Sequence, residues 1–168
     1  MEYNWKYFEK FSFGVEWNYR SIAMLLFLVM LPNLLGMMNM GTIYGFKIHF
    51  FQIAIFIAAL VYGPMGGMLS GLAGSAYSAY AMSNPYIVAG NMILGFFAGL
   101  FARYGLNTVL AVVLAYMMQL PWLLVTDYYI MHLPVAFITS LVIALATSNM
   151  VWAVAAHYTA KPIARILK

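Results

Sequence analysis

Five amide side chains interrupt apolar stretches of this sequence, where a polar group lowers stability unless it finds a partner. They are Asn33, Gln52, Asn91, Gln119 and Asn149. Other polar, aromatic and ionisable residues lie near the ends of the same stretches, and a cavity lined by such groups is the usual form of a small-molecule site. The predicted substrate-binding residues are Asn39, Lys47, His49, Gln52, Asn84, Asn91, Gln119, Trp122, Asp127 and His132.

Residue spacing brings several of these side chains together. Residues three and four apart share a helix face, which groups Gln119, Trp122 and Thr126 on one face and His49 with Gln52 on another. We expect hydrogen bonding and stacking from Gln52, Asn91, Gln119 and Trp122, and pairing of a ligand charge by Asp127, Lys47 or His132. Each residue taken singly has another interpretation, as a partner for a neighbouring helix or an aromatic anchor at the membrane surface.

The sequence lacks the patterns that enzymes and nucleotide-binding proteins use. No Gly-x-x-x-x-Gly-Lys-Ser/Thr run is present to hold a phosphate, and no His-Glu-x-x-His run to hold zinc. There are no cysteines, and the four carboxylates form no close pair within the apolar stretches. We therefore expect a protein that is not an enzyme and carries no cofactor or metal.

The sequence gives little support to copper binding, haem binding or intramembrane proteolysis. The 14 methionines would suit Cu(I), but methionine also fills irregular apolar space, and no cysteine or paired histidine accompanies it. Haem would need histidines at facing depths, whereas His49, His132 and His157 fall near the ends of apolar stretches. Ser70 and Ser75 lie among glycines, as in an intramembrane protease, but helix packing explains these small residues equally well.

The composition of the chain indicates that lipid, not water, surrounds it. Of its 168 residues, 65% are hydrophobic and 7% are charged, whereas soluble domains are about half apolar and about a quarter charged. A bilayer needs about 20 apolar residues per helix, so this length allows roughly six spans and no second domain. The net charge of +4 rests on too few cations for a nucleic-acid surface. We expect an all-α, multi-pass protein of the cell membrane.

Glycine and proline divide the apolar sequence into six expected spans, because proline cannot continue a helix and glycine tolerates a reversal. The clearest breaks are Gly63-Pro64 and Asn84-Pro85. The expected spans are residues 21–38, 48–62, 66–82, 86–102, 106–126 and 134–156. Residues 21–168 therefore form one transmembrane domain.

Residues 1–20 differ from this domain, because they carry half of the charged residues mixed with aromatic ones. That mixture suits the headgroup layer of a bilayer. We expect a short interfacial helix here, with a frayed terminus as the alternative.

Basic residues predict the orientation, since cytoplasmic loops of membrane proteins are enriched in Lys and Arg. With six spans and the N-terminus inside, Lys47 is the only Lys or Arg outside. The basic residues that then lie inside are Lys6, Lys10, Arg20, Arg103, Lys161, Arg165 and Lys168. We therefore expect both termini in the cytoplasm.

Small residues recur at intervals of four in the third and fourth expected spans. Gly67 with Gly71 and Gly95 with Gly99 are the clearest pairs. Such spacing lets helix backbones approach closely in lipid. The glycines could pack helices within the chain or dock another membrane subunit, and we assign them as predicted partner-docking residues.

The stretch 46–105 resembles the substrate-binding S components of energy-coupling factor (ECF) transporters, which are small six-helix membrane proteins. The features that carry this resemblance are Tyr62-Gly63-Pro64 at a helix end, a glycine-rich third helix, a turn at Pro85, and a fourth helix with Gly95, Gly99 and a final Arg103. S components commonly carry Ala-x-x-x-Ala on helix 1, where this chain has only Ala23.

The resemblance implies a function and a set of partners. A vitamin or related heterocycle would bind at the extracellular side under the loop of residues 39–47, and a T component with two ATPase subunits would supply the energy. The missing phosphate loop fits such a division of labour. Two alternatives stay open: a secondary carrier or channel that works alone, and an integral membrane enzyme.

Overall fold

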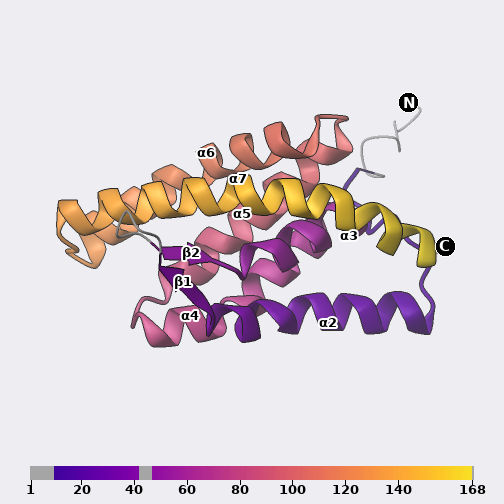
Figure 1. Ribbon diagram of the computed structural model, residues 1–168, viewed down its shortest axis with the longest axis horizontal. Helices are drawn as coiled ribbons and strands as arrows, with labels where there is room; N and C mark the ends of the chain where they lie inside the picture. Colours follow the sequence, from indigo (N-terminus) through magenta and orange to yellow (C-terminus); the bar gives the residue numbers. More distant parts are fainter. Residues whose placement is uncertain (1–9, 42–46, 168) are drawn as a thin grey trace, which may run out of the picture.

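The computed structural model describes residues 10–41 and 47–167, apart from the side chains of 39–41 and 47–48. Helices lying side by side form an elongated bundle, with one short antiparallel pair of strands at one end (Figure 1). In chain order the elements are α2 (Tyr19–Gly36), β1 (Asn39–Gly41), β2 (Lys47–His49), α3 (Gln52–Gly74), α4 (Ala76–Ala81), α5 (Tyr86–Arg103), α6 (Thr108–Leu124), the π-helical turn η1 (Val125–Ile130) and α7 (Val135–Ile166).

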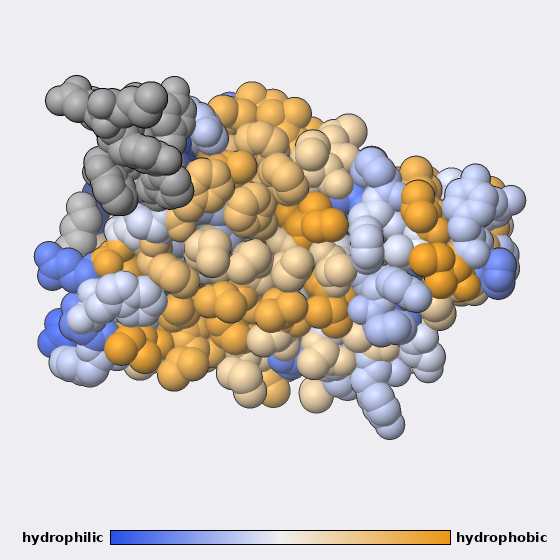
Figure 2. Space-filling model, turned by 180° about the vertical axis from the view of Figure 1, so that it is seen from behind, coloured by the Kyte–Doolittle hydropathy of each residue, from blue (hydrophilic) through white to orange (hydrophobic). Residues whose placement is uncertain are grey.

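Five helical stretches among the described residues are long and apolar enough to cross a membrane. They cover Tyr19–Gly36, Gln52–Ala81, Tyr86–Arg103, Thr108–Ile130 and Val135–Ile166. Apolar residues cover the middle of the face drawn in Figure 2, and hydrophilic residues gather towards its two ends. This distribution fits the expected all-α, multi-pass membrane protein.

The count is five rather than six because the second and third expected spans belong to one helical stretch. Gly63 interrupts α3 with φ 71° and ψ −163°, immediately before Pro64. A Cβ placed on Gly67 would lie 2.8 Å from the Cβ of Ala59, whereas a straight helix would hold these positions about 12 Å apart. The chain therefore reverses at the predicted Gly63-Pro64 break, and the two halves of α3 pack against each other.

Helix α3 forms the centre of the bundle. Tyr62 and Phe56 are fully buried in it, and two hydroxyls tie it to the neighbouring α2. The Tyr62 hydroxyl donates to the Ser21 carbonyl at 2.8 Å, and the Ser70 hydroxyl donates to the Leu28 carbonyl at 2.7 Å. Because lipid supplies no hydrogen bonds, such internal partners are the means by which buried polar groups are satisfied.

Glycines bring α3 and α5 into backbone contact. A Cβ on Gly67 would lie 2.2 Å from the Gly95 carbonyl oxygen, and one on Gly71 would lie 2.2 Å from that of Asn91. A Cβ on Gly99 would meet the backbone of the α3 break in the same way. The four glycines assigned to partner docking are thus buried within the chain, and the alternative of internal packing replaces that assignment.

The lead-in segment is not helical over residues 10–18, so the expected interfacial helix is wrong for this part; residues 1–9 lie outside the described chain. The segment crosses the end of α5, where the Arg103 guanidinium donates to the Phe13 carbonyl at 3.2 Å. Lys10 lies over the ring of Tyr104, 3.7 Å from its centroid. Helix α2 then begins after Asn18, whose side chain accepts from the Ser21 N–H.

The two ends of the bundle differ in charge. The start of α2 and the end of α7 lie at one end, which we call the terminal end, and β1 and β2 lie at the other, the hairpin end (Figure 1). Basic residues mark the helix ends at the terminal end: Arg20, Arg103, Lys161 and Arg165.

The contact between α3 and α5 predicts opposite effects for two alanine substitutions in α5. Gly95→Ala should lower stability by about 1–3 kcal/mol, because the new methyl group forces the two backbones apart. Gly90→Ala should leave stability unchanged or raise it slightly, since its Cβ would meet other atoms only at 3.4 Å or more and alanine favours the helix. Thermal unfolding in detergent measures both, and equal midpoints would contradict the tight contact.

Candidate functional site

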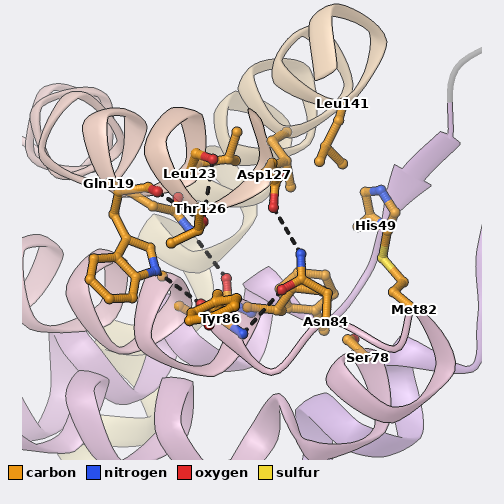
Figure 3. Close-up of a pocket in the computed structure, with 16 residues that line it drawn as sticks. His49, Ser78, Met82, Asn84, Tyr86, Gln119, Leu123, Thr126, Asp127 and Leu141 are labelled. Atoms are coloured by element: carbon orange, nitrogen blue, oxygen red, sulfur yellow. Dashed lines mark hydrogen bonds between the residues drawn. The ribbon is translucent and has the colours of Figure 1, made fainter. Parts of the chain in front are cut away.

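A cavity of about 70 Å³ lies at the hairpin end, between α4, α5, α6 with η1, and α7. Figure 3 shows the side chains that line it. Of the ten predicted substrate-binding residues, the structure brings six together around this cavity: His49, Asn84, Asn91, Gln119, Trp122 and Asp127. These residues come from four separate parts of the chain, so the cavity depends on the packing of the whole bundle.

A directional chain of hydrogen bonds runs from α3 to α6 behind the cavity. The Ser75 hydroxyl donates to the Gly71 carbonyl, so its oxygen is left to accept, and it accepts from the Asn91 Nδ2 at 2.8 Å. This orientation turns the Asn91 Oδ1 towards Gln119, whose Nε2 donates to it at 3.3 Å. A carbonyl can only accept, so the Gly71 carbonyl determines the direction of every step.

The chain of bonds ends on an oxygen that has no partner. Gln119 is 4% exposed, and its Oε1 makes no hydrogen bond within the described structure. Turning the amide over would place that oxygen against the Asn91 oxygen, so the bonded orientation is the stable one. A buried acceptor without a donor costs about 1–3 kcal/mol, which a ligand with an N–H or O–H group would recover.

Asp127 supplies the carboxylate of the cavity. It is 4% exposed, and its Oδ1 accepts from the Asn84 Nδ2 at 2.8 Å (Figure 3). The Asn84 side-chain oxygen in turn accepts from the Tyr86 N–H at 3.1 Å, so the amide is held from both sides. Asp127 lies in the π-helical turn, where the Met131 N–H bonds to the Thr126 carbonyl five residues back. Single π-turns of this kind are frequent at functional sites.

Aromatic side chains form one wall of the cavity. The Trp122 indole N–H donates to the Tyr86 carbonyl at 3.0 Å, and the two rings lie 6.4 Å apart at 59°. On the opposite side, the His49 N–H donates to the Ser148 hydroxyl at 3.1 Å and its carbonyl accepts from the Trp152 indole at 2.6 Å. These two bonds hold the end of β2 against α7.

Four predicted residues are not shown at the cavity. Gln52 is fully buried in α3 but does not line the cavity, and both of its amide atoms lack a partner in the described structure. His132 is exposed in the turn before α7, with φ 51°, and also lies outside the lining. The side chains of Asn39 and Lys47 lie outside the described residues.

The other two intramembrane amides differ from each other. Asn33 joins α2 to the region of α3 and α4, because its Nδ2 donates to the Ala73 carbonyl and its oxygen accepts from the Tyr77 N–H. Asn149 in α7 is buried, and neither of its amide atoms has a partner in the described structure.

Sequence reasoning missed the role of Ser75. Its position four residues after Gly71 could have indicated that its hydroxyl reaches the Gly71 carbonyl, but only the fold shows that Asn91 donates to it. The apolar part of the lining from α7, Leu141 and Leu145, was also missed. These residues carry no signal within the apolar run of residues 141–146. Among the described residues, no three His, Asp or Glu side chains gather to hold a metal ion.

Comparison with protein-family models, curated proteins and solved structures finds no match for this chain. The resemblance of residues 46–105 to S components therefore stays a prediction. What the fold itself supplies is a bundle of apolar helices with a small, largely apolar cavity that several polar side chains line, at the end opposite Arg20, Arg103, Lys161 and Arg165.

The directional hydrogen bonds predict that two buried asparagines differ in their importance. Asn91→Leu should lower stability by about 1–3 kcal/mol, because it leaves the buried Gln119 amide without its acceptor. The Ser75 hydroxyl keeps its bond to the Gly71 carbonyl. Asn149→Leu is the matched control, and it should be neutral or stabilising because the asparagine makes no hydrogen bond there. Thermal unfolding in detergent compares the two variants. An Asn149 variant that loses as much stability as the Asn91 variant would contradict the assignment.

Proposed function

We propose that this chain is the substrate-binding membrane subunit of an ECF-type uptake transporter. It captures a small organic micronutrient, a vitamin or related heterocycle, and partner ATPases supply the energy. The observation that carries the proposal is the cavity at the hairpin end. It combines three amides, a carboxylate and the aromatic rings of Phe51, Tyr86 and Trp122 in a chain that has no phosphate loop of its own.

The proposed orientation follows from the basic residues. The positive-inside rule assigns the terminal end, with Arg20, Arg103, Lys161 and Arg165, to the cytoplasm. The hairpin end and its cavity then face the exterior. The reversal at Gly63 supports six passes, because it separates α3 into two antiparallel segments. The first segment is short, and the β1–β2 hairpin completes its crossing near the outer surface.

The cavity has to enlarge to take a whole micronutrient. Its volume of about 70 Å³ lies below the range of about 300–1,000 Å³ that is typical of ligand sites. The part of the lining that gives way is the end of β2 at His49, which borders the cavity. Ligand binding shifts the protein between its states only by its differential affinity for them. ATP hydrolysis by the partners therefore drives release to the inside.

Cysteine reporters test the proposed topology, since the chain contains no cysteine. We expect Tyr80→Cys and His132→Cys to react with a membrane-impermeant maleimide on intact cells. Tyr104→Cys and Arg165→Cys should react only after the membrane is opened. All four side chains are exposed in the structure. If residues 52–81 cross the membrane once, the labelling pattern of these four positions is reversed, and the six-pass arrangement fails.

Affinity purification from native membranes in mild detergent tests the function. The tagged chain should retain a membrane scaffold subunit and two ATPases, and denaturation should release a small organic molecule that mass spectrometry detects. The double variant Gln119→Ala/Trp122→Ala should lose the small molecule and keep the protein partners, because both residues line the cavity and lie away from the terminal end.

Two outcomes would contradict the proposed function. A chain that purifies without ATPases and transports solute in liposomes by itself is a secondary carrier. A double variant that retains the small molecule shows that α6 does not contribute to the binding site.

A further inference from the structure

The hydrogen bonds of the cavity leave two acceptors with spare capacity. One is the Gln119 Oε1, which is buried and has no partner in the described structure. The other is the Asp127 carboxylate, for which the described structure shows one side-chain hydrogen bond, from Asn84. A carboxylate has about four lone-pair sites, so most of its capacity remains open.

Several donors around these acceptors are engaged with the protein. Each of the following donates one hydrogen bond to a protein oxygen: the amides of Asn84, Asn91 and Gln119, the indole of Trp122 and the hydroxyl of Thr126. The Gln119 amide is held in one orientation, because the Gly71 carbonyl sets the direction of the chain of bonds that ends on it. The Gln119 Oε1 and the Asp127 carboxylate are therefore the groups that can receive hydrogen bonds from a ligand.

The charge of the cavity limits the class of ligand that it can bind. Asp127 is the only carboxylate that lines the cavity, and it forms no salt bridge with any side chain that the structure describes. As an anion, a buried carboxylate is unfavourable unless a cation compensates it. A neutral ligand with hydroxyl groups would satisfy Gln119 but leave this charge uncompensated. His49 is the other strongly ionisable side chain of the lining, and it belongs to the hairpin that is bonded to α7.

Shape favours a planar cation. Trp122 and Tyr86 present a tilted pair of rings at the cavity wall, and cations bind favourably over such faces. The volume of about 70 Å³ lies well below that of a whole ligand site, so the cavity in this conformation accepts a head group of a few atoms.

We propose that the cavity binds a planar organic cation of the amidinium or guanidinium class, with its charge on Asp127 and an N–H donated to the Gln119 Oε1. This inference rests on the proposed function, because it names the class of substrate that the same cavity takes. The rest of the substrate would extend under the β1–β2 hairpin.

Titration with guanidinium chloride against urea isolates the effect of charge, since the two molecules are planar and similar in size. The full chain in detergent micelles, labelled with ¹⁵N at tryptophan, gives four indole signals, one for each tryptophan. At matched ionic strength, the Trp122 signal should shift saturably with guanidinium in the millimolar range, and urea should bind at least about tenfold more weakly. The Trp17 signal, from the terminal end, is the internal reference.

Two variants locate the binding groups. Asp127→Asn keeps an oxygen for Asn84 but removes the charge, and it should weaken guanidinium binding by about tenfold or more. Gln119→Met should weaken it about threefold to tenfold by removing one neutral acceptor. The second variant keeps the test decisive if the first does not fold.

The outcomes separate this inference from the proposed function. Acetate shifting the Trp122 signal in preference to guanidinium, or equal binding of guanidinium and urea, overturns the cation assignment. A co-purified acidic or neutral micronutrient overturns it too, while the chain remains a substrate-binding subunit. Guanidinium binding by a chain that transports without ATPases supports the cation site and overturns the ECF-type function.

Discussion

The backbone contact between α3 and α5 is the constraint on which the cavity depends. Glycines at 67, 71, 95 and 99 let the two helices approach until their main-chain atoms touch. That approach places Asn91 of α5 against the Ser75 hydroxyl at the end of α3, and Asn91 then engages Gln119 of α6. Any side chain larger than hydrogen at the contact separates the helices and breaks the first of these bonds. The arrangement of the polar residues at the cavity therefore depends on the glycine contact between α3 and α5, which involves no polar side chain.

A polar network between apolar helices is more specific than one in water. The core of a bilayer contains no water that could hydrogen-bond a polar group, so each donor must find an acceptor within the protein. Starting from the Gly71 carbonyl, this requirement fixes the orientation of the serine and of both amides. The acceptor that this chain of bonds leaves without a donor is the Gln119 Oε1. An unsatisfied acceptor is a cost to stability, and its position at a cavity rather than in a packed helix interface is what connects it to ligand binding.

Much of the fold and part of the site could be predicted from the sequence, for identifiable reasons. The Gly63-Pro64 break is visible because a proline and a glycine act locally, and the six cavity residues stand out because polar side chains are rare in apolar helices. The sequence does not show which helices touch, so it leaves open whether the glycines pack helices within the chain or dock another subunit. It also hides the π-helical turn that carries Asp127, because one additional residue in a turn has no compositional signature. Gln52 matched the expected pattern and still lies away from the cavity, since its orientation depends on how the first half of α3 packs.

The walls of the cavity are held by different kinds of contact, and under the proposed function this difference indicates where a ligand would enter. The α3–α5 side is held by backbone contacts that cannot loosen without separating two central helices. The wall formed by β2 and α7 includes the hydrogen bonds of the His49 backbone to Ser148 and Trp152 and the ring contact of Phe50 with Trp152. A typical hydrogen bond contributes only about 0.5–1.5 kcal/mol, so such bonds exchange for water or ligand at small net cost. Under the proposed function, we therefore expect the hairpin side to open first and the polar groups on α5, α6 and η1 to keep their arrangement.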